Sequence, residues 1–146
     1  MNESPTNLSQ DGDNQVATTF LRLPEWVNND AALVRRGRGC SATFLLGAGS
    51  VPLYVTVAEG NIVDITRGPV LMRSWRFAIR ANAEAWHRFW QPIPAPGYND
   101  LFAMSRFGHA TIEGDLQPLM ANLRYVKEVL AAPRRAMSEA VLRPSA

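Results

Sequence analysis

The sequence predicts an α+β fold: a five-stranded, mainly antiparallel sheet with helices packed on one side, enclosing an apolar cavity. Two patterns carry this prediction. Between residues 40 and 80, apolar and polar side chains alternate with the period of two that is typical of half-buried strands. Beyond residue 82, apolar residues recur about every 3.6 residues, as they do on one face of a helix. This separation of strands and helices along the chain is typical of the α+β class.

The length and composition predict one globular domain. The chain has 146 residues, of which 47% are apolar and 19% charged. We expect a disordered N-terminal tail over residues 1–17, because this polar segment would lose more entropy on ordering than its few apolar groups return on burial. A single domain over residues 18–132 follows, and residues 133–146 form a basic C-terminal tail.

The same composition indicates a soluble, cytoplasmic protein. No apolar run approaches the roughly 18 residues of a membrane span. Residues 1–15 lack the basic start and the apolar stretch of a secretory signal, and the single cysteine, Cys40, cannot form an intramolecular disulfide. The formal net charge is only +2, with acids and bases interspersed. Nucleic acid is therefore not expected as a partner, and the local cluster of Arg35, Arg36 and Arg38 is interpreted as a solvated helix end.

The first elements are predicted from turn and capping residues. A short apolar lead-in over residues 21–26 precedes a short helix over 31–36, for which Asp30 or the two asparagines before it can provide the N-cap. Alternation then predicts four strands in succession: 40–46, 53–57, 62–67 and 74–80. The clearest alternation is in the last of these, where Trp75, Phe77 and Ile79 share one face.

Three helices and a last strand complete the predicted domain. Asn82 can cap the first helix, which places Trp86, Phe89 and Trp90 on one face and ends before the prolines of residues 92–96. A second helix over 101–107 and a strand over 109–113 follow. One long amphipathic helix is predicted over 116–130, capped by Asp115, because leucines and valines recur there at spacings of three and four.

The aromatic and apolar side chains of this second half exceed what packing needs, which predicts a binding site for an apolar molecule. Trp86 and Trp90 lie beside the proline loop, and each indole needs a hydrogen-bond partner, so we expect them at a wet rim or cavity mouth. The predicted ligand-binding residues are Trp75, Phe77, Trp86, Phe89, Trp90, Leu101, Phe102, Met104, Phe107, Leu119, Met120 and Leu123.

No arrangement of residues predicts catalysis, a cofactor or a metal. His87 and His109 do not lie at a metal-ligand spacing from other ligands, no serine has a nucleophile-elbow context, and no glycine-rich phosphate loop is present. One enzymatic alternative is a cone-shaped isomerase that uses Asp100 and His109 as acid and base. Such a fold usually places its long helices before its sheet, which is the reverse of the order predicted here.

Three segments of the sequence resemble the sterol-carrier-protein-like family of nonspecific lipid-transfer domains. They are VPLYVTVAEGNIVDITRG, FAIRANAEAWHRF and FGHATIEGDLQPLMANL. In that family a glycine-bounded last strand passes through a Gly-Asp pair into the final helix, and Gly114 and Asp115 stand at those places. The resemblance covers roughly residues 40–130 and implies a five-stranded sheet, backed by helices that enclose an apolar tunnel for sterols, acyl groups or other lipids, without chemistry.

The chain departs from the family in ways that leave the ligand class open. The segment before the first strand is shorter and less regular than the family's opening helix, and the end of the chain, Arg-Pro-Ser-Ala, is not of the peroxisomal Ser-Lys-Leu type. The predicted partners are a hydrophobic small molecule and, transiently, a membrane. The alternative function is an accessory or dimerisation module that docks on a partner enzyme, or on a second copy, through the Trp86 and Trp90 surface.

Overall fold

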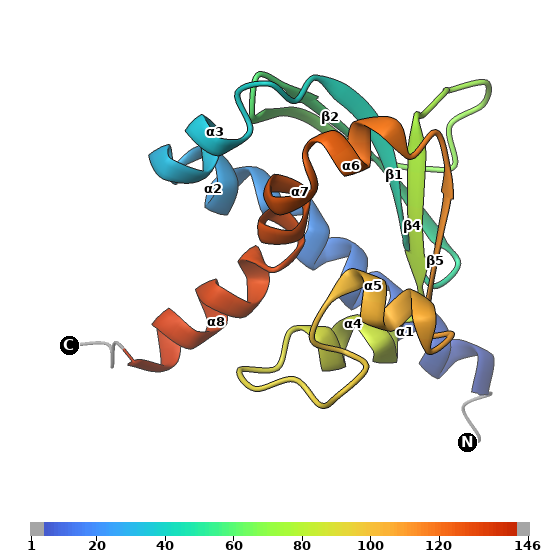
Figure 1. Ribbon diagram of the computed structural model, residues 1–146. Coiled ribbons are helices and arrows are strands. Elements are labelled where there is room, and N and C mark those ends of the chain that lie inside the picture. The colour runs from blue at the N-terminus through green and yellow to red at the C-terminus, as the bar shows by residue number, and fades with distance from the viewer. Residues whose placement is uncertain (1–4, 143–146) are drawn as a thin grey trace.

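We describe residues 5–142 in a computed structural model (Figure 1). The strands are β1 (Ala42–Ala48), β2 (Val51–Ala58), β3 (Asn61–Arg67), β4 (Phe77–Ala81) and β5 (Ala110–Gly114). The helices are α1 (Pro5–Leu21), α2 (Leu23–Asn28), α3 (Ala31–Arg36), α4 (Ala83–Phe89), α5 (Leu101–Arg106), α6 (Gln117–Ala121), α7 (Leu123–Leu130) and α8 (Ala132–Leu142). None of the helices in this described part is long and apolar enough to cross a membrane.

The strands form a mixed, mostly antiparallel sheet. Over residues 5–142 it has five strands in the order β3-β2-β1-β4-β5, in which β1 and β4 are parallel and the other neighbours antiparallel. Each predicted strand is confirmed within a few residues. The register aligns apolar side chains across the sheet, with Leu46 opposite both Leu53 and Ile79, and Ile79 opposite Ile112. This row forms the floor of the core.

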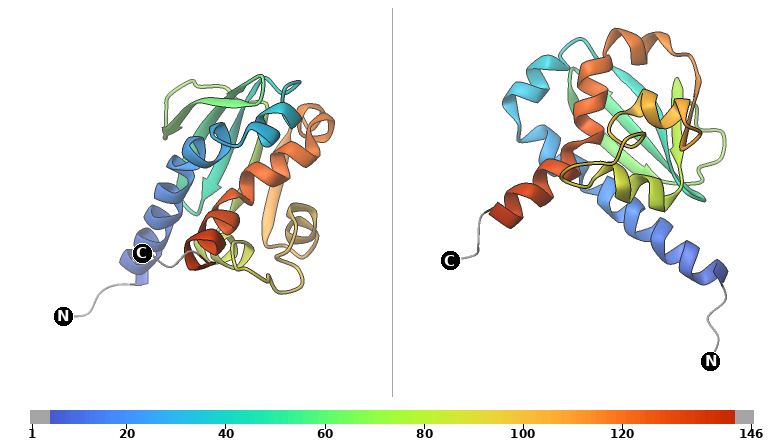
Figure 2. Two further views of the ribbon diagram at one scale, coloured as in Figure 1. Left: turned by 90° about the vertical axis from the view of Figure 1, so that its left-hand side faces the viewer. Right: turned by 60° about the horizontal axis from the view of Figure 1, so that its bottom comes forward.

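The helices cover one face of the sheet, as predicted. Figure 2 shows α1, α4 and α7 on the same side of the strands, and the main core lies between them and the sheet. The opposite face is covered by the β3–β4 connection, residues 68–76, which projects on the far side from the helices in Figure 1. Val70 and Trp75 of this connection pack against Leu45, Tyr54 and Ala78. The sheet therefore carries a large core on one face and a small one on the other.

The N-terminal segment differs from the expected disordered tail. Within residues 1–17, the described part from Pro5 onward belongs to α1. Val16, Ala17 and Phe20 are completely buried, because positions i, i+1 and i+4 of a helix share a face that here meets the sheet and α4. The polar composition of the segment concealed this face, since its apolar residues are concentrated at its end. Residues 1–4 lie outside the described residues.

The C-terminal part shows two further differences. The predicted single helix over 116–130 is divided at Asn122, whose backbone leaves the helical region (φ −125°, ψ 31°) and whose side-chain amide donates to the Pro118 carbonyl at 2.9 Å. An asparagine side chain that bonds the backbone in this way competes with helix continuation. Of the expected basic tail over 133–146, the residues as far as Leu142 belong to α8, and the remainder lies outside the described residues.

Candidate functional site

Trp86 of α4 and Trp90, the residue that caps the end of this helix, lie inside the fold. Trp86 has 0% and Trp90 2% of its surface exposed. The indole Nε1 of Trp86 donates to the Gly47 carbonyl at 2.9 Å, and that of Trp90 donates to the Leu130 carbonyl at 2.8 Å. Phe20 of α1 meets both rings edge-on, with centroid separations of 5.0 and 5.3 Å. The expectation of a wet rim at these two residues is therefore wrong, because both indole N–H groups find backbone partners in the interior.

The structure brings most of the predicted ligand-binding residues together beneath the sheet. Seven are buried in the main core, and two more lie partly buried, Leu123 at its edge and Phe102 on α5. The buried seven are Phe77, Trp86, Phe89, Trp90, Leu101, Met104 and Leu119. They come from β4, α4, α5 and α6, so the topology gathers residues that are more than forty positions apart in sequence.

Trp75 lies on the other face of the sheet. The alternation of Trp75 with Phe77 and Ile79 predicted one continuous strand, but β4 begins only at Phe77. Trp75 belongs to the β3–β4 connection, where it packs against the small outer core and lies 5.9 Å from the Arg80 guanidinium. The period of two does not reveal where a strand begins, which is why sequence reasoning placed Trp75 with the core.

Phe107 and Met120 point into solvent, with 62% and 55% of their surfaces exposed. Phe107 follows the last residue of α5 and so no longer continues its buried face. Met120 is next to the fully buried Leu119 on α6, and adjacent helical positions differ by about 100° in direction. Neither side chain lines the interior in this conformation.

A pocket opens where α4, α5, α7 and α8 meet. Its volume is about 240 Å³, and most of the surface exposed in it is apolar, although several of the lining residues carry polar ends. The residues that line it are Phe89, Asn99, Asp100, Leu101, Lys127, Glu128, Ala131 and Arg134. Phe89 and Leu101 also belong to the main core, so the pocket leads directly to the gathered aromatic residues. Sequence reasoning missed Ala131 and Arg134, because the contact that places them here joins segments about forty residues apart.

Charged side chains form the rim of this pocket. Lys127 pairs with Asp100 at 2.8 Å, and its ammonium lies 5.2 Å from the Phe102 ring centroid. Arg134 donates from Nε to the Phe89 carbonyl at 2.9 Å, and its guanidinium lies 4.7 Å from the Phe89 ring centroid. Burial lowers the pKa of the Arg134 guanidinium from its usual value, with a smaller contribution from Arg135, yet a guanidinium remains charged at neutral pH. The arrangement suits an apolar group inside and a polar group at the mouth, where Asp100 and Glu128 balance the charges of Lys127 and Arg134.

The interior beyond the pocket is closed in this conformation. Trp86, Met104 and Leu119 have no surface that a water molecule can reach. A pocket of about 240 Å³ is also smaller than the ~300–1,000 Å³ of typical ligand sites. A guest larger than a short chain must therefore separate the helices from one another, or from the sheet.

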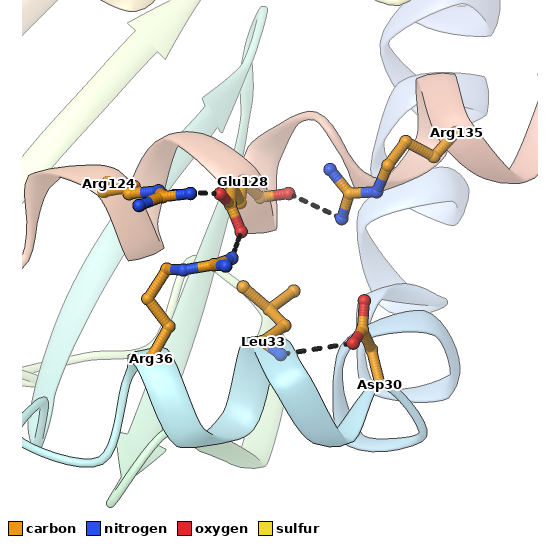
Figure 3. A network of polar contacts seen from close by, with 6 residues as sticks. All are labelled: Asp30, Leu33, Arg36, Arg124, Glu128 and Arg135. Carbon is orange, nitrogen blue, oxygen red and sulfur yellow. Dashed lines mark hydrogen bonds and ion pairs between the residues drawn. The ribbon is translucent and has the colours of Figure 1, made fainter.

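Figure 3 shows the contacts that join the helices beside this pocket. Glu128 of α7 accepts from Arg36 of α3 and, at 3.3 Å, from Arg124 on its own helix. Arg135 of α8 donates to the Glu128 carbonyl at 3.1 Å. At the start of α3, Asp30 accepts from the Leu33 backbone at 3.1 Å, which confirms it as the cap. The expected solvated helix end is thus only partly correct, because Arg36 connects α3 to α7.

The proposed acid and base of an isomerase are not brought together. Asp100 lies at the start of α5 and is paired with Lys127, whereas His109 follows the end of that helix and stacks on Tyr98 with centroids 4.2 Å apart. The two residues line different pockets. His87 is exposed on α4. Within residues 5–142, no group of three or more histidine, cysteine or acidic side chains could hold a metal ion.

Comparison with known proteins places the fold. No protein-family model and no curated protein matches the chain. Among solved structures, it is similar to sterol carrier protein 2, with 14% identity, 81% of this chain and 92% of the other covered, and a TM-score of 0.60. It is also similar to the sterol carrier protein domain 2 of Helicoverpa armigera, with 14% identity, coverage of 82% and 88%, and a TM-score of 0.52. The chain thus has the fold of the sterol carrier proteins, which confirms at the level of fold the resemblance found in the sequence.

Proposed function

We propose that this protein binds and carries a hydrophobic small molecule, a lipid, a sterol or an acyl group, without chemical change. The guest lies between the sheet and helices α4, α5 and α7, and gains access through the pocket at Phe89, Leu101 and Ala131. The observation that carries the proposal is this pocket, which leads from the surface to the buried aromatic cluster in a fold shared with sterol carrier proteins.

Access requires α4 to separate from the junction of α7 and α8. Two side-chain bonds to backbone carbonyls hold this contact: Trp90 to Leu130 and Arg134 to Phe89. A neutral hydrogen bond such as that of Trp90 contributes about 1 kcal/mol to stability, and one from a charged group such as Arg134 about 1.5–3 kcal/mol. Burying a few hundred square ångströms of apolar guest supplies several kcal/mol at roughly 25 cal/mol per Å², before ordering costs. A lipid chain can therefore offset the loss of both bonds.

The alternative function, docking through an aromatic surface, loses the surface on which it depended. Trp86 and Trp90 are buried, so they cannot face a partner enzyme or a second copy without unfolding part of the core. The described residues that are large, apolar and exposed are spread over several helices, loops and strand β3, and Phe107 is the one aromatic residue among them.

A fluorescent fatty acid and a fluorescent sterol test the proposal directly. We expect one of the two probes to bind the purified protein with a dissociation constant in the low micromolar range or below. Native mass spectrometry of the fresh protein reports retained lipid in the same preparation. Failure to bind both probes, with no retained molecule, would overturn the proposal.

A matched pair of variants locates the site. Ala131→Phe places a ring in the pocket mouth, and we expect it to weaken probe binding roughly tenfold, since a bulky side chain there excludes the guest. Ala121→Phe makes the same change at an exposed position of α6, which is not among the lining residues, and should leave probe affinity within about twofold. Equal affinity in the two variants would place the guest elsewhere.

A further inference from the structure

The loop between α4 and α5 carries an apolar protrusion. Its tip, residues 92–96 (Pro-Ile-Pro-Ala-Pro, called here the proline tip), has no charged or polar side chain. Ile93 has 91% of its surface exposed, and only Pro94 among the five is partly buried. Ile93 gains nothing for the fold from burial, and the prolines on both sides extend it into a contiguous apolar surface, the kind of feature that marks interaction sites.

The loop that carries the proline tip borders the candidate pocket with both of its ends. Phe89, just before the loop, and Asn99 and Asp100, at its end, all line that pocket. The loop is also held firmly at its base. Tyr98 stacks on His109 with 17° between the ring planes, and the Arg88 guanidinium lies 5.4 Å from the Tyr98 ring centroid.

We propose that the proline tip inserts into the surface of a phospholipid bilayer and so brings the pocket mouth against the membrane. The inference rests on the proposed function and deepens it, because it names the surface from which a hydrophobic guest is taken or to which it is delivered. The protein binds this surface transiently.

The backbone of the tip suits an apolar medium. Proline has no N–H group, so three of the five residues bring no donor that must lose its hydrogen bond to water. Unpaired backbone groups are the main obstacle to placing irregular chain in lipid. The prolines also fix φ, so the tip loses little conformational freedom when it inserts. The β3–β4 connection, in contrast, is equally exposed at Leu71 and Met72, but both of these residues have backbone N–H groups.

A lipid surface fits the tip better than a protein partner does. A stable protein interface buries about 800 Å² and roughly 20–30 residues on each side. The tip offers five residues, and the remaining exposed apolar side chains are scattered. A bilayer needs no complementary surface, because its fluid interface adapts to a protrusion. Arg134 at the pocket rim donates to a neutral carbonyl, so its charge is available to an anionic head group.

Flotation with vesicles tests the proposal on the full chain. We expect the protein to float with phosphatidylcholine vesicles, and more strongly when phosphatidylglycerol is included. Ile93→Glu should reduce the bound fraction by roughly tenfold or more, since the apolar side chain that enters the bilayer in the proposed complex is replaced by a charge. Leu71→Glu is the matched control: Leu71 is also 91% exposed, but Figures 1 and 2 show its loop on the far side of the molecule from the α4–α5 loop. We expect binding within about twofold of the native protein.

A second measurement does not depend on affinity. Ile93→Cys and Leu71→Cys each carry one reactive thiol, because the native Cys40 is 3% exposed and burial raises the pKa of its thiol. An environment-sensitive dye at residue 93 should shift its emission to the blue with vesicles, whereas the same dye at residue 71 should not. Equal responses at the two positions, or equal losses in the two glutamate variants, would overturn the proposal. Absence of binding to both vesicle types would overturn it too. Binding of the proline tip to another protein, without vesicle binding, would likewise replace the bilayer with a protein partner.

Probe binding without vesicles separates this inference from the proposed function. Ile93→Glu should bind the fluorescent fatty acid or sterol as the native protein does, because the side chain lies outside the pocket lining. If Ile93→Glu loses vesicle binding but keeps probe binding, the result supports both the proposed function and the membrane contact of the proline tip. Vesicle binding by a protein that accepts no probe would end the proposed function and, with it, the role of the tip in delivery.

Discussion

The two faces of the sheet are built from the same alternating strands but are closed in different ways. The inner face meets the helices and buries large side chains completely, among them Phe44, Phe77 and Ile79. The small core on the outer face consists of Leu45, Tyr54 and Ala78, which lie beneath Val70 and Trp75 of a single connection.

The difference bears on where the proposed binding site lies. On the inner face the cover is divided among several helices, which under the proposed function part from the sheet to admit a guest. On the outer face one short connection covers a few side chains, and Arg73 ties it down through Thr56 and Asp64. Depth of burial and divided cover therefore favour a site on the helical side, which is where the pocket lies.

The largest expected effect is a difference in stability loss between two tryptophan variants, one on each face of the sheet. Trp86→Ala should destabilise the protein by about 3–5 kcal/mol, because it removes a fully buried ring and leaves the Gly47 carbonyl without its donor. Trp75→Ala, on the outer face, removes a partly buried ring and should cost about 1 kcal/mol. Urea unfolding of both variants measures the difference. Similar losses would mean that the two faces contribute equally.

An intermediate effect concerns the attachment of α1 to the sheet. Asp13 is buried and accepts from Ser50 at both its backbone N (3.0 Å) and its Oγ (2.9 Å), at the turn between β1 and β2. Asp13→Ala should cost about 1–3 kcal/mol, since it removes two hydrogen bonds to a carboxylate, which water at the exposed Ser50 replaces only in part. Asp11→Ala, at an exposed position of the same helix, should change stability by less than about 0.5 kcal/mol. Thermal unfolding of the two variants tests the pair, and equal midpoints would remove the role assigned to Asp13.

The smallest expected effect is a pH dependence of stability that comes from Asp64, on the outer face of the sheet. Hydrogen bonds from Thr66 and then from Arg73 lower the pKa of Asp64 below its usual value of about 3.9. The folded protein therefore binds this proton less readily than the unfolded chain does, and the resulting stability is present above that usual value and lost as the pH falls through the lower folded pKa. Asp64→Asn should be less stable than the native protein by under about 1 kcal/mol at neutral pH, because the pair is exposed.

Melting curves recorded from neutral pH down to the acid range check this sign. The gap between native protein and Asp64→Asn should narrow as the pH falls. A gap that widens toward acid would contradict the assignment.

Local patterns predicted much of this architecture because strands and caps depend on near neighbours. The hairpin turn at Glu59 and Gly60 shows why. Gly60 has φ +84°, and a side chain there would lie 2.3 Å from the Val34 carbonyl, so both the turn and its glycine are required. The cap at Asn82 is confirmed in the same way, since its side chain accepts from the Ala85 backbone at 2.8 Å.

Other features depended on partners that are distant in sequence. The buried face of α1 has three apolar residues, Val16, Ala17 and Phe20. Their contact with the sheet and α4 provides the burial that offsets the entropy cost of ordering a polar segment. Trp75 and Phe77 alternate in sequence, yet a strand boundary places them on opposite faces. Whether a tryptophan lies at a rim or in the interior depends on where its N–H finds an acceptor, and for Trp90 that acceptor is forty residues away.

By itself, the sequence determined the class of fold, the five strands in their order along the chain, the helices near α3, α4 and α5, and the apolar character of the helical side, because periodicity and turn chemistry are local. Only the tertiary structure decided which aromatic residues are enclosed, where the pocket opens, and which apolar loop stands beside it. The physical reason is that burial is a property of surfaces brought together by folding, and a chain read in order does not show which surfaces will meet.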